Sequence, residues 1–95
     1  MGMFFSSSKK MDVNGKLIVI TGGGSGMGLE MAKSFANDGA QVVITGRTQS
    51  KLEAAAKEHK NITPFVADVA KDEDMINLRD AMEERGGVDF LINSK

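Results

Sequence analysis

Short apolar runs alternate along the chain with longer segments in which apolar residues recur every three or four positions. The short runs are rich in β-branched and other aliphatic residues, which is typical of strands buried in a parallel sheet. They are residues 16–21, 41–45, 62–67 and 88–93. The longer segments between them predict amphipathic helices. Strands that alternate with helices of roughly 10–15 residues indicate right-handed βαβ units, and therefore an α/β fold with a parallel sheet.

Local signals give the ends of the three predicted helices. The first follows a Gly-rich stretch, runs to about Asn37 and is ended by Gly39. The second begins with capping-box spacing at Ser50-Lys-Leu-Glu53, and the third spans Asp72–Glu84 before Gly86-Gly87. Helical spacing places one set of side chains against the sheet: Met31, Ala32, Phe35, Ala36, Leu52, Ala55, Ala56, His59, Met75, Leu78 and Met82.

Residues 1–12 precede the first predicted strand and are interpreted as a peripheral leader. The Met3-Phe4-Phe5 patch is too short for the apolar core of a signal peptide. Met1-Gly2 followed by Ser6 matches the pattern for N-myristoylation, but a ragged leader is the simpler interpretation. The remaining residues, 13–95, are too few for more than one domain.

Composition and charge narrow the class of protein. The chain is 41% hydrophobic and 26% charged, with a net charge of −1 and scattered Lys and Arg residues. This balance gives no electrostatic field that would attract nucleic acid or a membrane surface. No apolar run approaches the roughly 18 residues of a membrane span. The absence of Cys excludes disulfides and thiolate metal ligands, and a cytoplasmic location fits this composition.

Two features that resemble ligand sites have simpler interpretations. The acidic cluster Asp72, Glu73 and Asp74 complements the dipole at the start of the third helix, and no further ligand group accompanies it. His59 is interpreted as a half-buried residue on the face of the second helix. Neither feature predicts a metal site.

A Gly-rich loop, Thr21-Gly-Gly-Gly-Ser-Gly-Met-Gly28, joins the first predicted strand to the first helix. Gly22 suits a sharp turn, Gly26 lets a pyrophosphate approach the backbone, and Gly28 lets the helix pack closely on the sheet. Backbone N–H groups and the dipole at the start of the helix favour an anion there. The loop therefore predicts a phosphate site formed by Gly22, Ser25, Gly26, Met27 and Gly28; the alternative is a flexible connection without a ligand.

Two other phosphate-binding patterns do not fit this loop. A Walker loop counted from Gly23 to Gly28 requires a Lys next, where Leu29 stands. The common dinucleotide pattern Gly-x-Gly-x-x-Gly, counted from Gly22, requires a Gly where Met27 stands. The spacing that fits is Thr-Gly-x-x-x-Gly-x-Gly.

This spacing resembles that of the short-chain dehydrogenase/reductase family, and the resemblance extends from about Val13 to Asn93. Four further motifs stand in the family's order and at family-like spacing: Val13-Asn14-Gly15-Lys16, Gly46-Arg47, Asp68-Val69 and Leu91-Ile92-Asn93. The resemblance implies a Rossmann-type three-layer fold, here a truncated four-stranded parallel sheet in the order 3-2-1-4 with three helices. It also implies an oxidoreductase that transfers hydride between a nicotinamide and a carbonyl or alcohol.

The residues after the second strand predict the cofactor. NAD-dependent members of the family usually have an acidic residue where this chain has Gly46. Without that carboxylate nothing repels a 2′-phosphate, and Arg47 offers a planar charged fork for it. Ser25 and Thr48 would assist through their hydroxyls. NADP is therefore the predicted cofactor and NAD the alternative, and a solvated turn arginine is the other interpretation of Arg47.

The resemblance assigns three further residues to the cofactor. It places Asp68 and Val69 beside the adenine ring, with the Asp68 carboxylate accepting from the amino group, and Asn93 near the ribose. The alternatives are structural: Asp68 as a turn or capping residue, and Asn93 as an ordinary strand-end residue. The family's Asn-Asn-Ala-Gly element breaks after Asn93, because Ser94 and Lys95 follow.

The family's catalytic groups are not found in this chain. Its general acid/base is a Tyr with a Lys four residues later and a Ser nearby, and this chain contains no Tyr. The preferred interpretation is the cofactor-binding part of an oxidoreductase, truncated before the catalytic residues. The alternative is a free-standing, non-catalytic dinucleotide-binding module that acts with a partner. A small-molecule substrate and homo-oligomers are expected only of full-length relatives.

The same sheet order predicts an uneven covering of the sheet. The fourth strand becomes an edge, which exposes apolar residues of Phe90–Ile92 beside unpaired backbone groups. Right-handed crossovers place the first two helices on one face and the third helix alone on the other. One helix cannot cover four strands, so apolar sheet surface is expected to remain exposed.

Overall fold

The computed structural model describes residues 12–94, and strands alternate with helices in the predicted order. The strands are β2 (Leu17–Thr21), β3 (Gln41–Gly46), β4 (Ile62–Val66) and β5 (Phe90–Asn93). The helices are α1 (Gly26–Asn37), α2 (Gln49–Ala56) and α3 (Asp72–Glu83). The myristoylation pattern and all of the predicted leader but Asp12 lie outside the described residues.

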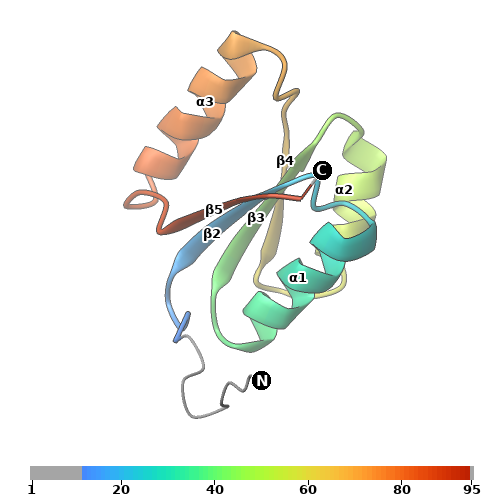
Figure 1. The fold of residues 1–95 in the computed structure, drawn as a ribbon, viewed down its shortest axis with the longest axis vertical. Coiled ribbons are helices and arrows are strands. Elements are labelled where there is room, and N and C mark those ends of the chain that lie inside the picture. The colour runs from blue at the N-terminus through green and yellow to red at the C-terminus, as the bar shows by residue number, and fades with distance from the viewer. Residues whose placement is uncertain (1–11, 95) are drawn as a thin grey trace, which may run out of the picture.

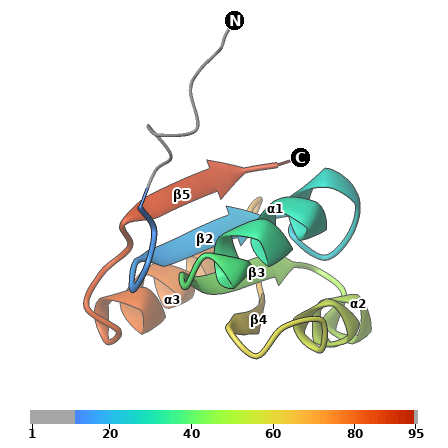
Figure 2. The same cartoon turned by 90° about the horizontal axis from the view of Figure 1, so that it is seen from below.

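The four strands form one parallel sheet in the order β4-β3-β2-β5. In chain order this is 3-2-1-4, which confirms the predicted topology. Pro64 lies in β4 at the margin of the sheet, where a missing N–H does not interrupt a central ladder. Figure 2 shows β5 at the opposite margin.

The helices cover the two faces of the sheet unequally (Figure 1). Side chains alternate between the faces along each strand, so that Ile18 and Ile20 pack with α1 and α2. Leu17 and Val19 lie on the other face, where the buried cluster is completed by Val43 and by Leu78 and Met82 of α3. The prediction that two helices cover one face and one helix the other is confirmed.

The start of the second helix differs from the prediction. Thr48, not Ser50, is the N-cap residue of α2, since its backbone is extended and its carbonyl accepts from the Leu52 N–H at 3.2 Å. The predicted capping box at Ser50 is therefore wrong. Glu53 instead accepts from the Gln49 side-chain amide at 2.8 Å, which is an i,i+4 pair along the helix.

His59 also differs from the prediction, because α2 ends at Ala56. The imidazole does not extend the buried face of that helix. Its Nδ1 accepts from the backbone N–H of Asn61 at 3.0 Å and so closes the turn before β4. The residue is half-buried and has a structural role in this connection.

The last strand begins at Phe90, two residues later than predicted. The reason lies in Asp89, whose carboxylate accepts from the Leu17 N–H at 2.8 Å. The Asp89 N–H in turn donates to the Leu17 carbonyl at 2.9 Å. A side chain thus occupies the place of a backbone carbonyl where β5 meets β2, and Val88 remains outside the ladder.

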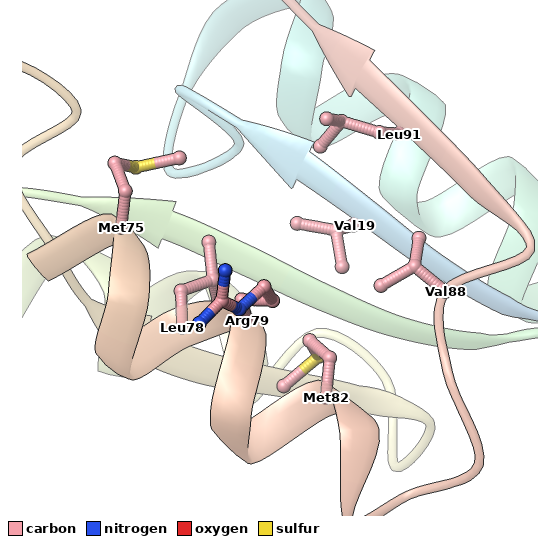
Figure 3. A pocket seen from close by; sticks show the side chains of 7 residues that line it. All are labelled: Val19, Met75, Leu78, Arg79, Met82, Val88 and Leu91. Carbon is pink, nitrogen blue, oxygen red and sulfur yellow. The ribbon is translucent and has the colours of Figure 1, made fainter. Parts of the chain in front are cut away.

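The face that carries α3 has an apolar groove beside β5 (Figure 3). Leu91 pairs in register with Val19 and is 64% exposed, while Val88 is 41% exposed. The groove has a volume of about 310 Å³ and is lined by Val19, Met75, Leu78, Arg79, Met82, Val88 and Leu91. Within residues 12–94, no helix is long and apolar enough to cross a membrane.

We expect the 95-residue chain to self-associate at micromolar concentration. Among the described strands β5 pairs only with β2, so its outer edge presents unpaired backbone groups next to the groove. Leu91→Lys places a charge on this surface and should shift the chain toward the monomer. Size-exclusion chromatography with light scattering over a concentration series measures the change.

Ile76→Lys is the matched control, because Ile76 is 48% exposed on α3 but does not line the groove. This variant should associate as the unchanged chain does. A parent chain that elutes as a monomer at every concentration would contradict the prediction.

Candidate functional site

The carboxyl ends of β2, β3 and β4 meet at one edge of the sheet, where the loops that follow them form a cleft. Ligands of open α/β sheets bind outside the carboxyl ends of the strands. The cleft has a volume of about 400 Å³, which lies within the usual range for small-ligand pockets. Its lining consists of Thr21, Gly22, Thr45, Gly46, Arg47, Thr48, Ala67, Asp68, Val69 and Ala70.

A smaller cavity of about 140 Å³ adjoins this cleft, and Gly22 and the segment 45–48 line both. The other residues that line it come from the glycine loop and from the first turn of α2. They are Gly24, Ser25, Lys51 and Leu52. The loops that follow β2, β3 and β4 therefore all contribute residues to the walls of these two adjoining cavities.

The three glycines of the predicted loop have three different surroundings. Gly22 has a φ of +74°, which a residue with a side chain rarely adopts. A Cβ added to Gly28 would lie 2.6 Å from the Gly22 carbonyl oxygen, so only glycine lets α1 approach the loop this closely. Gly26 has a φ of +59° and open space around it, which leaves the backbone accessible. The geometry fits the predicted turn, close packing and open approach.

Gly23 has a role that the sequence pattern missed. A Cβ added there would lie 2.6 Å from Ile44 Cγ2 and 3.2 Å from the Ile20 carbonyl oxygen. The loop therefore also packs tightly against β3, beneath the residues that could face a ligand. The pattern leaves position 23 free, and only the run of three glycines signals this constraint.

The start of α1 has no capping side chain. Its N-cap residue, Ser25, has an extended backbone and makes no side-chain capping hydrogen bond, and the first turn contains no acidic residue. The first turn of α3, by contrast, contains Asp72, Glu73 and Asp74. The positive end of the α1 dipole and its first N–H groups are thus left for an anion at the glycine loop.

Arg47 and Thr48 follow β3 directly, line both cavities and are exposed. In the described part of the chain, the Arg47 guanidinium makes no hydrogen bond or ion pair. A Cβ added to Gly46 would lie 3.4 Å from Leu52 Cδ2, an ordinary contact. Position 46 therefore has room for the Cβ of a side chain, so packing around that atom does not require the glycine found there.

Asp68 has the geometry of a turn residue and also lies at the cleft. Its Oδ1 accepts from the Ala70 N–H at 2.9 Å, so it is a turn residue, and it also lines the cleft together with Val69. Its own N–H donates to Asp74 Oδ2 at 2.8 Å. Asp74, interpreted from sequence only as a first-turn acid, therefore also positions the loop that carries Asp68.

The end of β5 is tied to the glycine loop by side chains. The Thr21 hydroxyl donates to Asn93 Oδ1 at 3.0 Å, so Asn93 lies beside the end of β2. The Ser94 hydroxyl lies 2.7 Å from the carbonyl oxygen of Thr21 and 3.2 Å from that of Gly22. Ser94 appeared in the sequence as the point where a motif breaks, and its structural role was missed.

The structure brings together only part of the predicted set. Gly22, Ser25, Arg47, Thr48, Asp68 and Val69 each line at least one of the two cavities. Gly26, Met27, Gly28 and Asn93 line neither, and Met27 is 77% exposed. Lys51, at the smaller cavity, was not predicted. Among residues 12–94, no group of three His, Cys, Asp or Glu residues could hold a metal ion.

Comparisons with known proteins agree with the fold and with the loop spacing. Residues 16–94 match the family described as short chain dehydrogenase. A short-chain dehydrogenase/reductase, VdtF of Byssochlamys spectabilis, is 38% identical over 98% of this chain and 32% of its own length. The human mitochondrial dehydrogenase/reductase SDR family member 2 is 42% identical over 83% of this chain and 30% of its own.

Solved structures give the same result. A short chain dehydrogenase from Bacillus anthracis has a TM-score of 0.80 and 44% identity over 84% of this chain and 34% of its own. A 3-ketoacyl-(acyl-carrier-protein) reductase from Brucella melitensis, complexed with NADH, has a TM-score of 0.76 and 40% identity over 83% and 33%. The chain spans about a third of the length of these relatives.

We expect Gly23→Ala to lower the free energy of unfolding by about 1–3 kcal/mol, the usual range for overpacking a tight site. The added methyl would meet Ile44 Cγ2 at 2.6 Å. Urea unfolding followed by circular dichroism measures the loss. Gly46→Ala is the control, because its methyl makes only an ordinary contact at 3.4 Å, and it should change the free energy by less than about 0.5 kcal/mol. Equal effects of the two substitutions would contradict this account of the loop.

Thr45→Val should leave stability unchanged or raise it by up to about 1 kcal/mol. The Thr45 hydroxyl is fully buried and has no hydrogen-bond partner among the described residues, so a methyl of the same shape replaces an unsatisfied group. Thr21→Val is the control: its hydroxyl has Asn93 Oδ1 and the Ile92 carbonyl as acceptors, and its loss should destabilise by about 0.5–1.5 kcal/mol. A loss at Thr45 as large as that at Thr21 would count against this interpretation.

Proposed function

The chain belongs to the short-chain dehydrogenase/reductase family, and from that premise we propose that residues 13–95 form a partial NAD(P)-binding Rossmann domain that binds NADP(H). One observation carries the choice of cofactor. Arg47, without an ion-pair partner in the described chain, lines both cavities beside Gly46, where no carboxylate opposes a phosphate. The dinucleotide, when bound, supplies hydride transfer between its nicotinamide and a carbonyl or alcohol, and that activity is proposed for the whole protein.

The glycine loop is proposed to hold the pyrophosphate. The start of α1 has no capping side chain, so its first backbone N–H groups are available to an anion. The space around Gly26 is open, so no Cβ blocks the approach to them. The tight contacts of Gly23 and Gly28 fix the loop against the sheet before a ligand arrives. Little backbone order then has to be gained on binding, which favours affinity. Met27, exposed beside this loop, is proposed to contact the same end of the cofactor.

The adenine end is proposed to lie in the larger cavity. Val69, 47% exposed at its wall, offers an apolar contact for the ring. One carboxylate oxygen of Asp68 accepts a hydrogen bond from the Ala70 N–H. The other oxygen is proposed to accept from the adenine amino group. Asn93, whose side-chain oxygen accepts from the Thr21 hydroxyl at the end of β2, is proposed to lie near the ribose.

The 2′-phosphate is proposed to occupy the smaller cavity. Arg47 can bind it with two parallel N–H groups, and Ser25 and Thr48 add hydroxyl donors. The Brucella relative was solved with NADH, and NAD therefore remains the alternative cofactor. The lack of an acid at Gly46 favours NADP in this chain. A cytoplasmic location is part of the same proposal.

We expect NADPH to bind more tightly than NADH by about 1.5–3 kcal/mol, the range for hydrogen bonds to a charged group. Isothermal titration calorimetry of the 95-residue chain with each dinucleotide gives the difference. Arg47→Ala should reduce it, because it removes the guanidinium from the cavity and leaves the sequence of the glycine loop unchanged. Equal affinities in the unchanged chain, or a preference untouched by Arg47→Ala, would overturn the assignment.

Gly46→Asp tests the same proposal from the opposite direction. The new side chain has room for its Cβ, and its carboxylate would repel a 2′-phosphate while accepting from a ribose hydroxyl. We expect NADPH affinity to fall at least about tenfold and NADH affinity to hold or rise. Gly46→Asn, which adds similar bulk without charge, is the control and should leave the preference for NADPH largely in place.

A further inference from the structure

We propose that Lys51 is a second cation of the 2′-phosphate site, so that the phosphate is held both by the β3–α2 loop and by the first turn of α2. This inference rests on the proposed NADP(H) function and names a residue that determines its specificity. It was not evident from sequence, because Lys51 lies four residues beyond Arg47, inside a helix that otherwise presents an ordinary polar face.

The position of Lys51 is fixed by its neighbour Leu52. The Leu52 side chain is only 2% exposed and is the nearest contact of a Cβ added at Gly24, at 3.3 Å. Leu52 thereby packs the first turn of α2 against the glycine loop. The Cβ of Lys51 lies 4.0 Å from the same added Cβ at Gly24. The lysine stem therefore starts beside the glycine loop, and Lys51 is one of the residues that line the smaller cavity.

The charges around this cavity are of one sign. Arg47 and Lys51 line it together with Ser25 and Thr48, and no acidic residue does. In the described chain neither cation has an ion-pair partner, whereas Lys33 pairs with Glu30 at 3.7 Å and with Glu58 at 3.6 Å. Two unneutralised cations beside one small cavity repel each other, and a dianion between them would offset that repulsion.

The two cations are suited to different tasks. The Arg47 guanidinium is a planar fork that can bind two phosphate oxygens at once, while the Lys51 ammonium is a compact charge on a flexible stem. Removing either one leaves the other, so a single substitution should reduce the preference for a 2′-phosphate without abolishing it. Only the double variant should bind both dinucleotides equally.

Two small probes separate the 2′-phosphate from the rest of the cofactor. Adenosine 2′,5′-bisphosphate and adenosine 5′-monophosphate differ only in the 2′-phosphate, and calorimetry with the full 95-residue chain compares them. Lys51→Gln should weaken binding of the bisphosphate about fivefold, an effect reduced by solvent screening, and leave the monophosphate unchanged. Lys51→Arg should retain most of the affinity.

Lys57→Gln is the matched control, since Lys57 is the exposed C-cap residue of the same helix and lines neither cavity. It should leave both affinities unchanged. Equal losses for the two probes in Lys51→Gln would assign Lys51 to the 5′-phosphate and overturn the inference. No loss for either probe would overturn it as well.

The outcomes for this inference and for the proposed function can be distinguished. If the unchanged chain binds the two probes equally, the NADP(H) function itself fails, and the role of Lys51 fails with it. If the unchanged chain prefers the bisphosphate and Arg47→Ala reduces that preference, a Lys51→Gln variant that still prefers it fully overturns only the inference about Lys51. Circular dichroism of each variant confirms that the fold is retained.

Discussion

The close approach of α1 and its glycine loop to the ends of β2 and β3 is the constraint on which the site depends. At Gly28 a side chain would collide with the Gly22 carbonyl, and at Gly23 it would collide with Ile44 of the core. The loop is therefore not a flexible connection: its backbone is packed on a close-packed interior that accepts no extra methyl group. Because the loop is held from below, its upper surface at Gly26 can remain open without becoming disordered.

Polar contacts extend this constraint across the sheet. The hydroxyl of Ser94, which follows the last strand, lies within hydrogen-bond distance of the carbonyl oxygens of Thr21 and Gly22. The Thr21 hydroxyl donates a hydrogen bond to the Asn93 side chain. At the other end of the same two strands, the Asp89 carboxylate binds the Leu17 N–H. β5 is thus fastened to β2 at both ends by side chains as well as by its ladder. Leu91 leaves part of this edge strand exposed. Hydrogen bonds at both of its ends nevertheless keep the strand in register with β2, next to the glycine loop.

The sequence predicted those features that follow from periodicity and from backbone chemistry. Alternating apolar runs predicted the strands, and the spacing of Gly22, Gly26 and Gly28 predicted the turn and the close packing of α1. The sequence did not predict the features that depend on contacts between residues far apart in the chain. The collision at Gly23 depends on Ile44, which is 21 positions away, and the role of Ser94 depends on carbonyl groups more than 70 residues earlier. Ser50 satisfied a local capping pattern, but the path of the chain after β3 placed Thr48 at the cap.

At the proposed cofactor site, the residues that support the loop differ from those assigned to the choice of ligand. Gly23, Gly28 and Leu52 are packed, so altering them disturbs the fold before it affects recognition. Arg47 and Lys51 are exposed, and a Cβ at Gly46 would make only an ordinary contact, so charge can be added or removed at these positions of the cavity at little cost in stability. A single carboxylate at position 46 would place a negative charge beside Arg47 and weaken the attraction for an anion, while α1, its loop and the core stayed in place. In the proposed site, a preference for a phosphate can therefore vary between otherwise similar chains much more readily than the packing of the loop that would bind the dinucleotide.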